Sequence, residues 1–211
     1  MMESYITVRQ PASDELIIQK SRFLCFAFPC STEDEALACL EKLRTQYRDA
    51  THHCYAYITG INGGIMRYSD DGEPGGTAGL PMMNVLRGEK VVNCCVVIVR
   101  YFGGTLLGTG GLVRAYTEGC KAALSAAGIV KMEMTAHELC EVPYSFWDTV
   151  RHEALKLPVR IDQESFHTAV TFRLSFRARD KEAVLNAMDR ITARHFVSIP
   201  EDETFDPWEN D

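Results

Sequence analysis

The sequence predicts an α+β protein with two domains, for three reasons. Its 211 residues are enough for one large domain or two small ones. Segments that alternate apolar and polar residues are interleaved with segments whose apolar residues recur at helical spacing. Glycine use changes abruptly along the chain, because fourteen of the fifteen glycines lie between Gly60 and Gly119. We therefore expect one domain at residues 1–134, a second at residues 135–200 and an acidic tail at residues 201–211.

Periodicity and capping residues predict the elements of the first domain. Ser31 and Thr32 precede two acids at the spacing of a capping box, which predicts the start of a helix. The run Val91–Phe102 is apolar at nearly every position, which predicts a strand buried on both faces. Gly128 is the expected C-terminal cap of the helix before it. The expected elements are strands at 6–8 and 16–28, a helix after residue 32, strands at 53–59 and 65–69, a helix at 81–86, a strand at 91–102, a helix at 112–127 and a strand at 129–135.

The second domain has a simpler pattern. We expect a helix that begins after Ser145 and ends before Pro158, and a second helix capped by Asp180. Strands are expected at residues 137–144, 159–164, 168–176 and 196–199. The resulting order, βαββαβ, is ferredoxin-like.

Charge excludes a strongly basic nucleic-acid-binding domain but leaves a local basic face open. The net charge is −7, and the last eleven residues, EDETFDPWEND, contain six acids and no base. The remainder is close to neutral, so the tail is expected to be a solvated acidic end.

Composition also predicts a cytoplasmic protein without a membrane partner. No run approaches the roughly 18 apolar residues of a transmembrane helix. The start, MMESYITVRQ, lacks the layout of a signal peptide. The eight cysteines contain no C-x-x-C pair, which favours reduced thiols and no metal site.

The first segment that could carry chemistry is SDDGEPGGTAG, residues 69–79. Its three carboxylates suit a hard cation, but the loop lacks the twelve-residue calcium pattern. Turn formation and helix capping are therefore the favoured roles. The candidate binding residues here are Asp70, Asp71, Glu73, Gly75 and Gly76.

The second segment is RYFGGTLLGTGGLVRAY, where a buried strand passes through a glycine-rich turn into a helix expected to begin at Leu112. A helix N-terminus behind glycines favours anions, and two arginines could clamp a phosphate. The spacing fits neither a Walker A loop nor the dinucleotide motif, so a tight turn with an exposed arginine is the alternative. The candidate anion- or RNA-binding residues are Arg100, Tyr101, Phe102, Gly103, Gly104, Gly108, Gly110, Gly111 and Arg114.

The third segment is HHCYAY, residues 52–57, which is expected to be a strand. Alternation places His53, Tyr55 and Tyr57 on one face. A histidine beside tyrosines could act as an acid-base group or stack on a base. Packing is the more common role of half-buried strand residues of this kind.

These three segments, SDDGEPGGTAG, VVIVRYFGGTLLGTGGLVRAYTEG and ATHHCYAY, resemble the signature of the IMPACT family, in particular its bacterial YigZ-type members. The resemblance covers essentially the whole chain. It implies an N-terminal domain similar to domain 2 of ribosomal protein S5, as a two-layer α/β sandwich. It also implies a ferredoxin-like C-terminal domain similar to a domain of elongation factor G. Eukaryotic relatives regulate translation by competing for a coactivator of the kinase that senses uncharged tRNA, and they carry an RWD-type N-terminal domain that is absent here.

The leading function is therefore that of a cytosolic regulatory protein associated with translation, which binds RNA, the ribosome or a translation factor. No catalytic residue and no cofactor are expected, and the oligomeric state is left open. One alternative is an enzyme or sensor that binds a small phosphorylated ligand at the Gly103–Arg114 loop. A second alternative is a protein-interaction module.

Overall fold

The computed structural model describes residues 4–208, which form two compact units. The first unit holds residues 5–131, and the second holds residue 4 and residues 132–208. The border falls within one strand, β7 (Ile129–Val142). That each unit folds by itself stays a prediction. No helix within residues 4–208 is long and apolar enough to cross a membrane.

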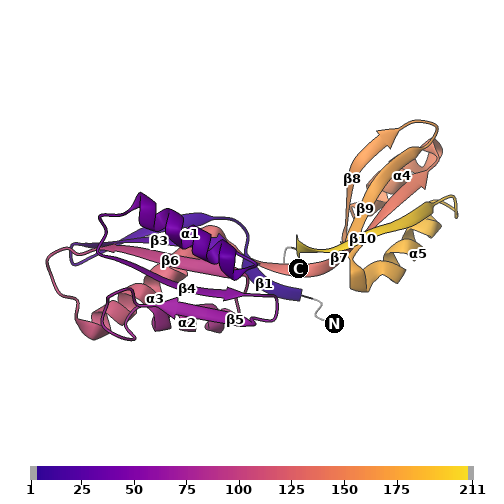
Figure 1. Cartoon of the computed structure of the whole chain (residues 1–211). Coiled ribbons are helices and arrows are strands. Elements are labelled where there is room, and N and C mark those ends of the chain that lie inside the picture. Colours follow the sequence, from indigo (N-terminus) through magenta and orange to yellow (C-terminus); the bar gives the residue numbers. More distant parts are fainter. Residues whose placement is uncertain (1–3, 209–211) are drawn as a thin grey trace. The chain divides into compact units, whose positions relative to one another are not determined.

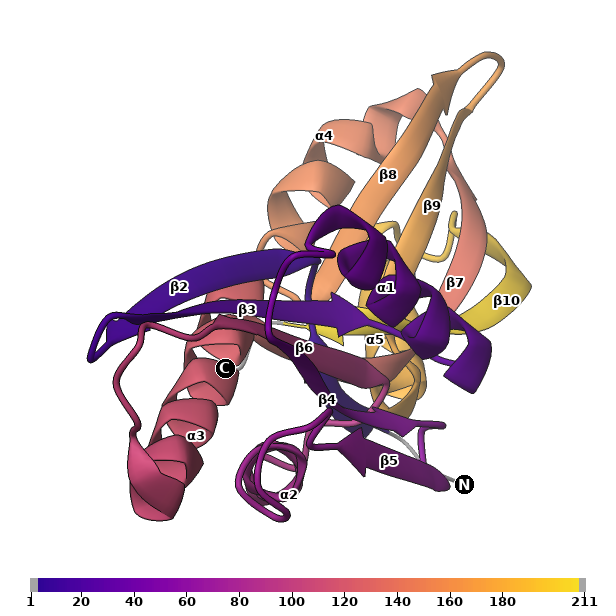
Figure 2. The same cartoon turned by 60° about the vertical axis from the view of Figure 1, so that its left-hand side comes forward.

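The first unit is built on a five-stranded antiparallel sheet with the order β2–β3–β6–β4–β5. Helix α1 covers one face of this sheet, and helices α2 and α3 cover the other (Figure 1, Figure 2). The elements are β1 (Ser4–Val8), β2 (Ala12–Ile18), β3 (Ser21–Pro29), α1 (Glu33–Gln46), β4 (His52–Thr59), β5 (Ile65–Ser69), α2 (Gly79–Gly88), β6 (Cys94–Tyr101) and α3 (Gly108–Ala127).

This arrangement has three layers, one more than the two-layer sandwich that the family resemblance implies, because α1 covers the second face of the sheet. The reason lies in β6, whose residues from Cys94 to Arg100 are all buried. Its residues face the two sides alternately: Val96 and Ile98 join the core under α2 and α3, and Val97 joins the core under α1. A central strand that is apolar on both faces needs a helical layer on each.

The expected strand at residues 16–28 is also wrong, because the chain reverses within it. Strands β2 and β3 form an antiparallel hairpin instead. The turn between them places Gln19 and Lys20 at φ 46° and 68°. Positive φ at both central residues is the geometry of a two-residue hairpin turn, which usually carries glycine or asparagine. The sequence therefore holds no turn signal at this point.

The second unit has the expected element order βαββαβ. Both helices pack on one face of the sheet, where Trp147, Val150, Val184 and Met188 join its core. In this unit β10 pairs with β7, β7 with β9 and β9 with β8. Strand β1, most of which belongs to the first unit, pairs with β7, the strand that crosses the border. After β7 the elements are α4 (Tyr144–Ala154), β8 (Val159–Phe166), β9 (Val170–Arg177), a 3-10 turn (Ala178–Asp180), α5 (Lys181–Ile191) and β10 (Val197–Trp208).

The acidic tail expected at residues 201–211 is mostly a strand, because β10 continues to Trp208. Trp208 is buried, and its indole N–H donates to Thr135 Oγ1 at 2.8 Å. Its ring lies under the guanidinium groups of Arg160 and Arg177, at 4.1 and 4.7 Å. These contacts hold the acidic segment on the second unit. Residues 209–211 lie outside the described part of the chain.

Candidate functional site

The acidic loop, residues 69–79, is fixed by its own carboxylates. Asp70 accepts hydrogen bonds of 2.8 to 2.9 Å from the backbone N–H groups of Gly76, Ala78 and Gly79. Burial alone would raise the pKa of Asp70, but these three donors outweigh it and lower that pKa. Asp70 therefore satisfies the start of α2, in the manner of a helix cap.

Asp71 ties the same loop to β4 and α1. Its Oδ2 accepts the backbone N–H of His53 at 2.6 Å, and its Oδ1 lies 3.5 Å from a guanidinium nitrogen of Arg44. Its backbone carbonyl lies 2.8 Å from Nδ1 of His52. Because a carbonyl oxygen only accepts, we assign the hydrogen to Nδ1 of His52.

Glu73 is the buried centre of the loop. Its Oε1 accepts hydrogen bonds from the Arg100 guanidinium at 2.6 Å and from the Tyr116 hydroxyl at 2.7 Å. The side chains of Glu73 and Arg100 are only 3% and 5% exposed. Nε2 of His52 lies 3.8 Å from the other carboxylate oxygen. Glu73 therefore joins the loop, the end of β6 and the third turn of α3 in one hydrogen-bonded cluster.

The surroundings of this cluster keep its neutral donors protonated. Burial raises the pKa values of Tyr116 and Cys54 far above neutrality. The Cys54 thiol lies 3.0 Å from the carbonyl oxygen of Asp70 and 3.3 Å from the Tyr116 hydroxyl. Within residues 4–208, no three His, Cys, Asp or Glu side chains are placed to hold a metal ion. Each of the three carboxylates accepts hydrogen bonds from groups of the protein itself.

The second glycine-rich loop is arranged differently. Helix α3 begins at Gly108, earlier than the expected Leu112, so Gly110 and Gly111 lie in its first turn and Arg114 in its second. The residue at its N-cap, Leu107, gives the helix no side-chain hydrogen bond, and its first turn contains no acid. Periodicity missed these residues because they carry no apolar side chain.

The glycines of this second loop differ in what requires them. A Cβ at Gly103 would lie 2.0 Å from the backbone carbon of Lys20, so the close approach of two backbones requires glycine there. Gly104 and Gly108 have φ of +82° and +69°. A Cβ at Gly111 would lie 3.1 Å from the Leu107 side chain. Gly110 alone has neither a positive φ nor any atom within 4 Å of such a Cβ.

The expected phosphate clamp does not include Arg100. Its guanidinium is buried against Glu73 and lies 3.3 Å from the hydroxyl of Ser21. It also lies 5.6 Å from the ring centre of Phe102. Arg114, in contrast, is exposed. Phe102 is 46% exposed, and the hydroxyl of half-buried Tyr101 donates to an acid, Asp49, at 3.0 Å.

The candidate residues of the third segment, His53, Tyr55 and Tyr57, lie on the α1 face of the sheet, and Cys54 and Ala56 join the core on the other face. His53 is buried, and burial lowers its pKa. Tyr55 stacks on Tyr57 with 5.9 Å between ring centres. Both observations favour packing. Gly75, by comparison, is exposed in the acidic loop.

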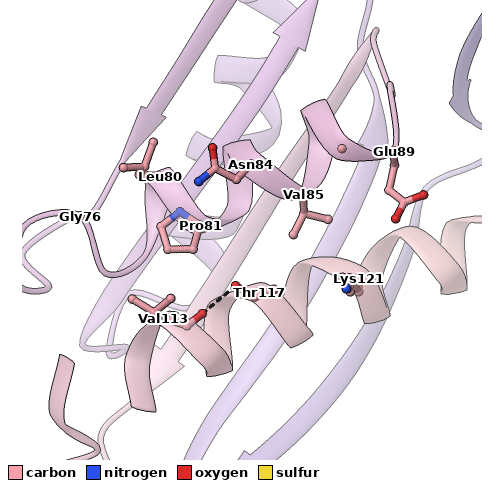
Figure 3. Close-up of a pocket in the computed structure, with 10 residues that line it drawn as sticks. Gly76, Leu80, Pro81, Asn84, Val85, Glu89, Val113, Thr117 and Lys121 are labelled. Atoms are coloured by element: carbon pink, nitrogen blue, oxygen red, sulfur yellow. Dashed lines mark hydrogen bonds between the residues drawn. The ribbon is translucent and has the colours of Figure 1, made fainter. Parts of the chain in front are cut away.

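Sequence reasoning missed a groove of about 520 Å³ between α2 and α3 (Figure 3). Val113, Thr117 and Lys121 line it from α3, and Pro81 and Val85 line it from α2. The signal in the sequence was the four-residue spacing of the α3 residues, which places them on one face of that helix. Gly76 of the acidic loop lies at the edge of the same groove.

Comparison with known proteins identifies the family. Residues 19–124 match the Impact N-terminal domain, which is half of the chain. The chain is 34% identical over 192 residues to the IMPACT family member YvyE of Bacillus subtilis, and the match covers 91% of this chain and 88% of the relative. It is 43% identical over 125 residues to the IMPACT family member YigZ of Escherichia coli, covering 58% and 61%. A crystal structure described as a hypothetical protein is similar at 29% identity and a TM-score of 0.61, covering 96% of this chain and 99% of that one. The chain therefore belongs to the IMPACT family.

Proposed function

We propose that this chain is a translation-associated protein that binds RNA through the phosphate backbone, at the loop of residues 102–114. The resemblance to the IMPACT family supports the link to translation, because its eukaryotic members are translational regulators. The observation that carries the RNA-binding site is Gly110, a helical glycine that packing does not require.

The start of α3 has the polarity that attracts a phosphate. The helix is 20 residues long, and neither a side-chain cap nor an acid neutralises its first turn. The N–H groups of such a turn and the helix dipole together favour an anion. Glycine in a helix costs about 0.5–1 kcal/mol relative to alanine. The function of glycine at position 110 is therefore to let a phosphate approach the backbone.

Two side chains extend this polarity into an RNA-binding surface. Phe102 is 46% exposed, and an exposed aromatic ring can stack on an unpaired base. Arg114 is exposed in the second turn of α3, where its charge can pair with a neighbouring phosphate. An exposed aromatic ring beside groups that attract phosphate is a combination typical of proteins that bind single-stranded RNA.

Replacing Gly110 by alanine tests this site without damaging the fold. Gly110→Ala should melt at or above the parent temperature and should bind a labelled single-stranded oligoribonucleotide at least tenfold more weakly. Gly88→Ala, in α2, is the matched control because its Cβ also meets no atom within 4 Å. It should change RNA binding less than twofold. Equal binding by parent and Gly110→Ala, measured by fluorescence anisotropy at low salt, would contradict the proposed site.

The phosphorylated small ligand remains the alternative for the same loop, because the shared chemistry is a phosphate. Sedimentation of the tagged chain through a sucrose gradient separates the two functions. If the chain co-migrates with ribosomal particles and nuclease treatment abolishes this co-migration, the result supports RNA binding. A saturable melting shift with nucleotides, without co-migration, supports a small ligand. Absence of both leaves the interaction module, for which the α2–α3 groove offers a surface.

We also propose that the two units fold independently, as an S5-like domain and a ferredoxin-like domain. Support for the second comes from the β10–β7–β9–β8 pairing and from two helices on one face. Residues 132–208 expressed alone should give dispersed amide spectra and a cooperative melt. A disordered fragment would show that the units depend on each other.

A further inference from the structure

Two cysteines of the first unit face each other at the junction of β3 and α1. Cys30 follows the last residue of β3, and Cys39 lies in the second turn of α1. Their sulfur atoms are 3.9 Å apart, which is sulfur–sulfur contact. We propose that Cys30 and Cys39 are an oxidation site that closes to an intramolecular disulfide when a hydroperoxide reaches Cys39. This inference is independent of RNA binding.

The backbone around the pair is held on both sides. The N–H of Cys30 donates to the carbonyl of Asn93 at 2.9 Å, next to β6. The start of α1 is fixed by its capping box, where Glu35 N–H donates to Thr32 Oγ1 at 3.3 Å and the Glu35 carboxylate accepts the N–H of Ser31 at 2.7 Å. The two thiols are therefore held next to each other by the backbone of the fold.

Accessibility makes the two thiols unequal. Seven of the eight cysteines are buried, and Cys39 is the exception with a partly exposed side chain. Cys30 is only 2% exposed, and burial raises the pKa of its thiol. An oxidant in solution therefore meets Cys39 first, and Cys30 is the resolving thiol behind it.

The reaction balances with one hydroperoxide. The Cys39 thiol loses its proton, and the thiolate attacks the peroxide oxygen, so that the O–O bond breaks and Cys39 becomes a sulfenic acid. The leaving oxygen takes up a proton in place of the one that Cys39 lost and departs as an alcohol, or as water when the oxidant is hydrogen peroxide. The Cys30 sulfur then attacks the Cys39 sulfur, forming the S–S bond and breaking the S–O bond. The hydroxide leaves with the proton of Cys30 as water. Two thiols have lost two electrons, and the peroxide has gained them.

Closure needs a shorter separation than the one observed. A disulfide requires about 2.0 Å between sulfur atoms, so at least one side chain must rotate and approach. The product would join the end of β3 to α1 and would restrict local opening of that helix. Amide exchange in α1 should therefore slow after oxidation.

The full chain, kept native, can be treated with hydrogen peroxide, alkylated and mapped by mass spectrometry. We expect one Cys30–Cys39 cross-link, two hydrogens lighter than the reduced peptides and reversed by dithiothreitol. Cys39→Ser should abolish the link, and Cys30→Ser should stop at a sulfenic acid that dimedone traps. Cys120→Ser, which removes a buried thiol elsewhere, is the control and should retain the link.

Two results would overturn the assignment. The first is a link from Cys30 to the neighbouring buried Cys95 in place of Cys39. The second is a parent protein that accumulates dimedone-reactive Cys39 without any disulfide. Both results are measured on the parent protein, so the test remains valid even if a serine variant fails to fold.

Discussion

The two loops of the first unit are both rich in glycine, but only one of them contains acids and their surroundings are opposite in character. In the loop of residues 69–79, every carboxylate is engaged by the protein, and Asp70 alone accepts three backbone N–H groups. In the loop of residues 102–114, the start of α3 receives no side-chain cap, and Gly110 has space around it. The carboxylates of the acidic loop are therefore used within the fold, whereas the start of α3 keeps the uncapped first turn that the proposed binding site requires.

Among these predictions, substitution of Glu73 in the acidic loop should cause the largest loss of stability. Glu73→Gln leaves Arg100 buried beside a neutral amide, and breaking a buried ion pair costs about 3–5 kcal/mol. Urea unfolding should show this loss. Glu41→Gln is the control, because Glu41 pairs with Arg44 on the surface at 2.8 Å, where such pairs contribute about 0–1 kcal/mol. Equal midpoints for both variants would mean that the acidic loop is not anchored by Glu73.

Alanine substitutions at two glycines of the second loop should differ in their effect on stability, by less than the effect at Glu73. Gly103→Ala places a Cβ 2.0 Å from the backbone of Lys20, so the two strands' ends must move apart. Overpacking of this kind costs about 1–3 kcal/mol. Gly110→Ala, in open space, should instead be neutral or stabilising by up to about 1 kcal/mol. Melting temperatures are measured for both variants. An equal decrease in Gly103→Ala and Gly110→Ala would show that the two glycines do not differ sterically, and the proposed binding site rests on that difference.

The sequence predicted the features that depend on neighbouring residues. The capping box of Thr32 and Glu35 and the C-terminal glycine of α3, Gly128, are confirmed. The apolar run that became β6 predicted burial on both faces, which is also confirmed. The turn at Gln19 and Lys20 was not predictable, because no residue there signals positive φ.

The roles of the polar residues depended on distant partners. Glu73 meets Arg100 and Tyr116, which are 27 and 43 residues away in sequence. No local pattern indicates that such a carboxylate is already neutralised. The start of β10 was predicted, but its continuation through the acidic residues after Pro200 was not, for the same reason. Arg173, on β9, donates to the Asp202 carboxylate at 2.6 Å, and no local pattern indicates this pairing.

Removing the carboxylate charge of Asp70 should have a moderate, pH-dependent effect. Its lowered pKa means that its stabilisation is present above the ordinary value of 3.8 and is lost as pH falls through the folded value. Asp70→Asn keeps the shape but weakens the acceptor, and the loss at pH 7 should be about 0.5–2 kcal/mol, as for helix caps. Denaturant midpoints of parent and variant should converge as pH is lowered below 3.8. A constant difference across that range would show that ionisation of Asp70 is not the stabilising feature.

Substitution of Arg114 should have the smallest effect on stability and a clear effect on RNA binding. Arg114 is exposed, so Arg114→Gln should change the free energy of unfolding by no more than about 0.5 kcal/mol. If its guanidinium contacts a phosphate, RNA affinity should fall, and the dependence of log K on log salt should become shallower by about one contact. Arg87→Gln, at an exposed site in the last turn of α2, is the matched control and should leave the slope unchanged. Anisotropy titrations at several salt concentrations measure both quantities. An unchanged slope in Arg114→Gln, beside clear binding by the parent, would leave the start of α3 without its cation and reduce the second loop to scaffold like the first.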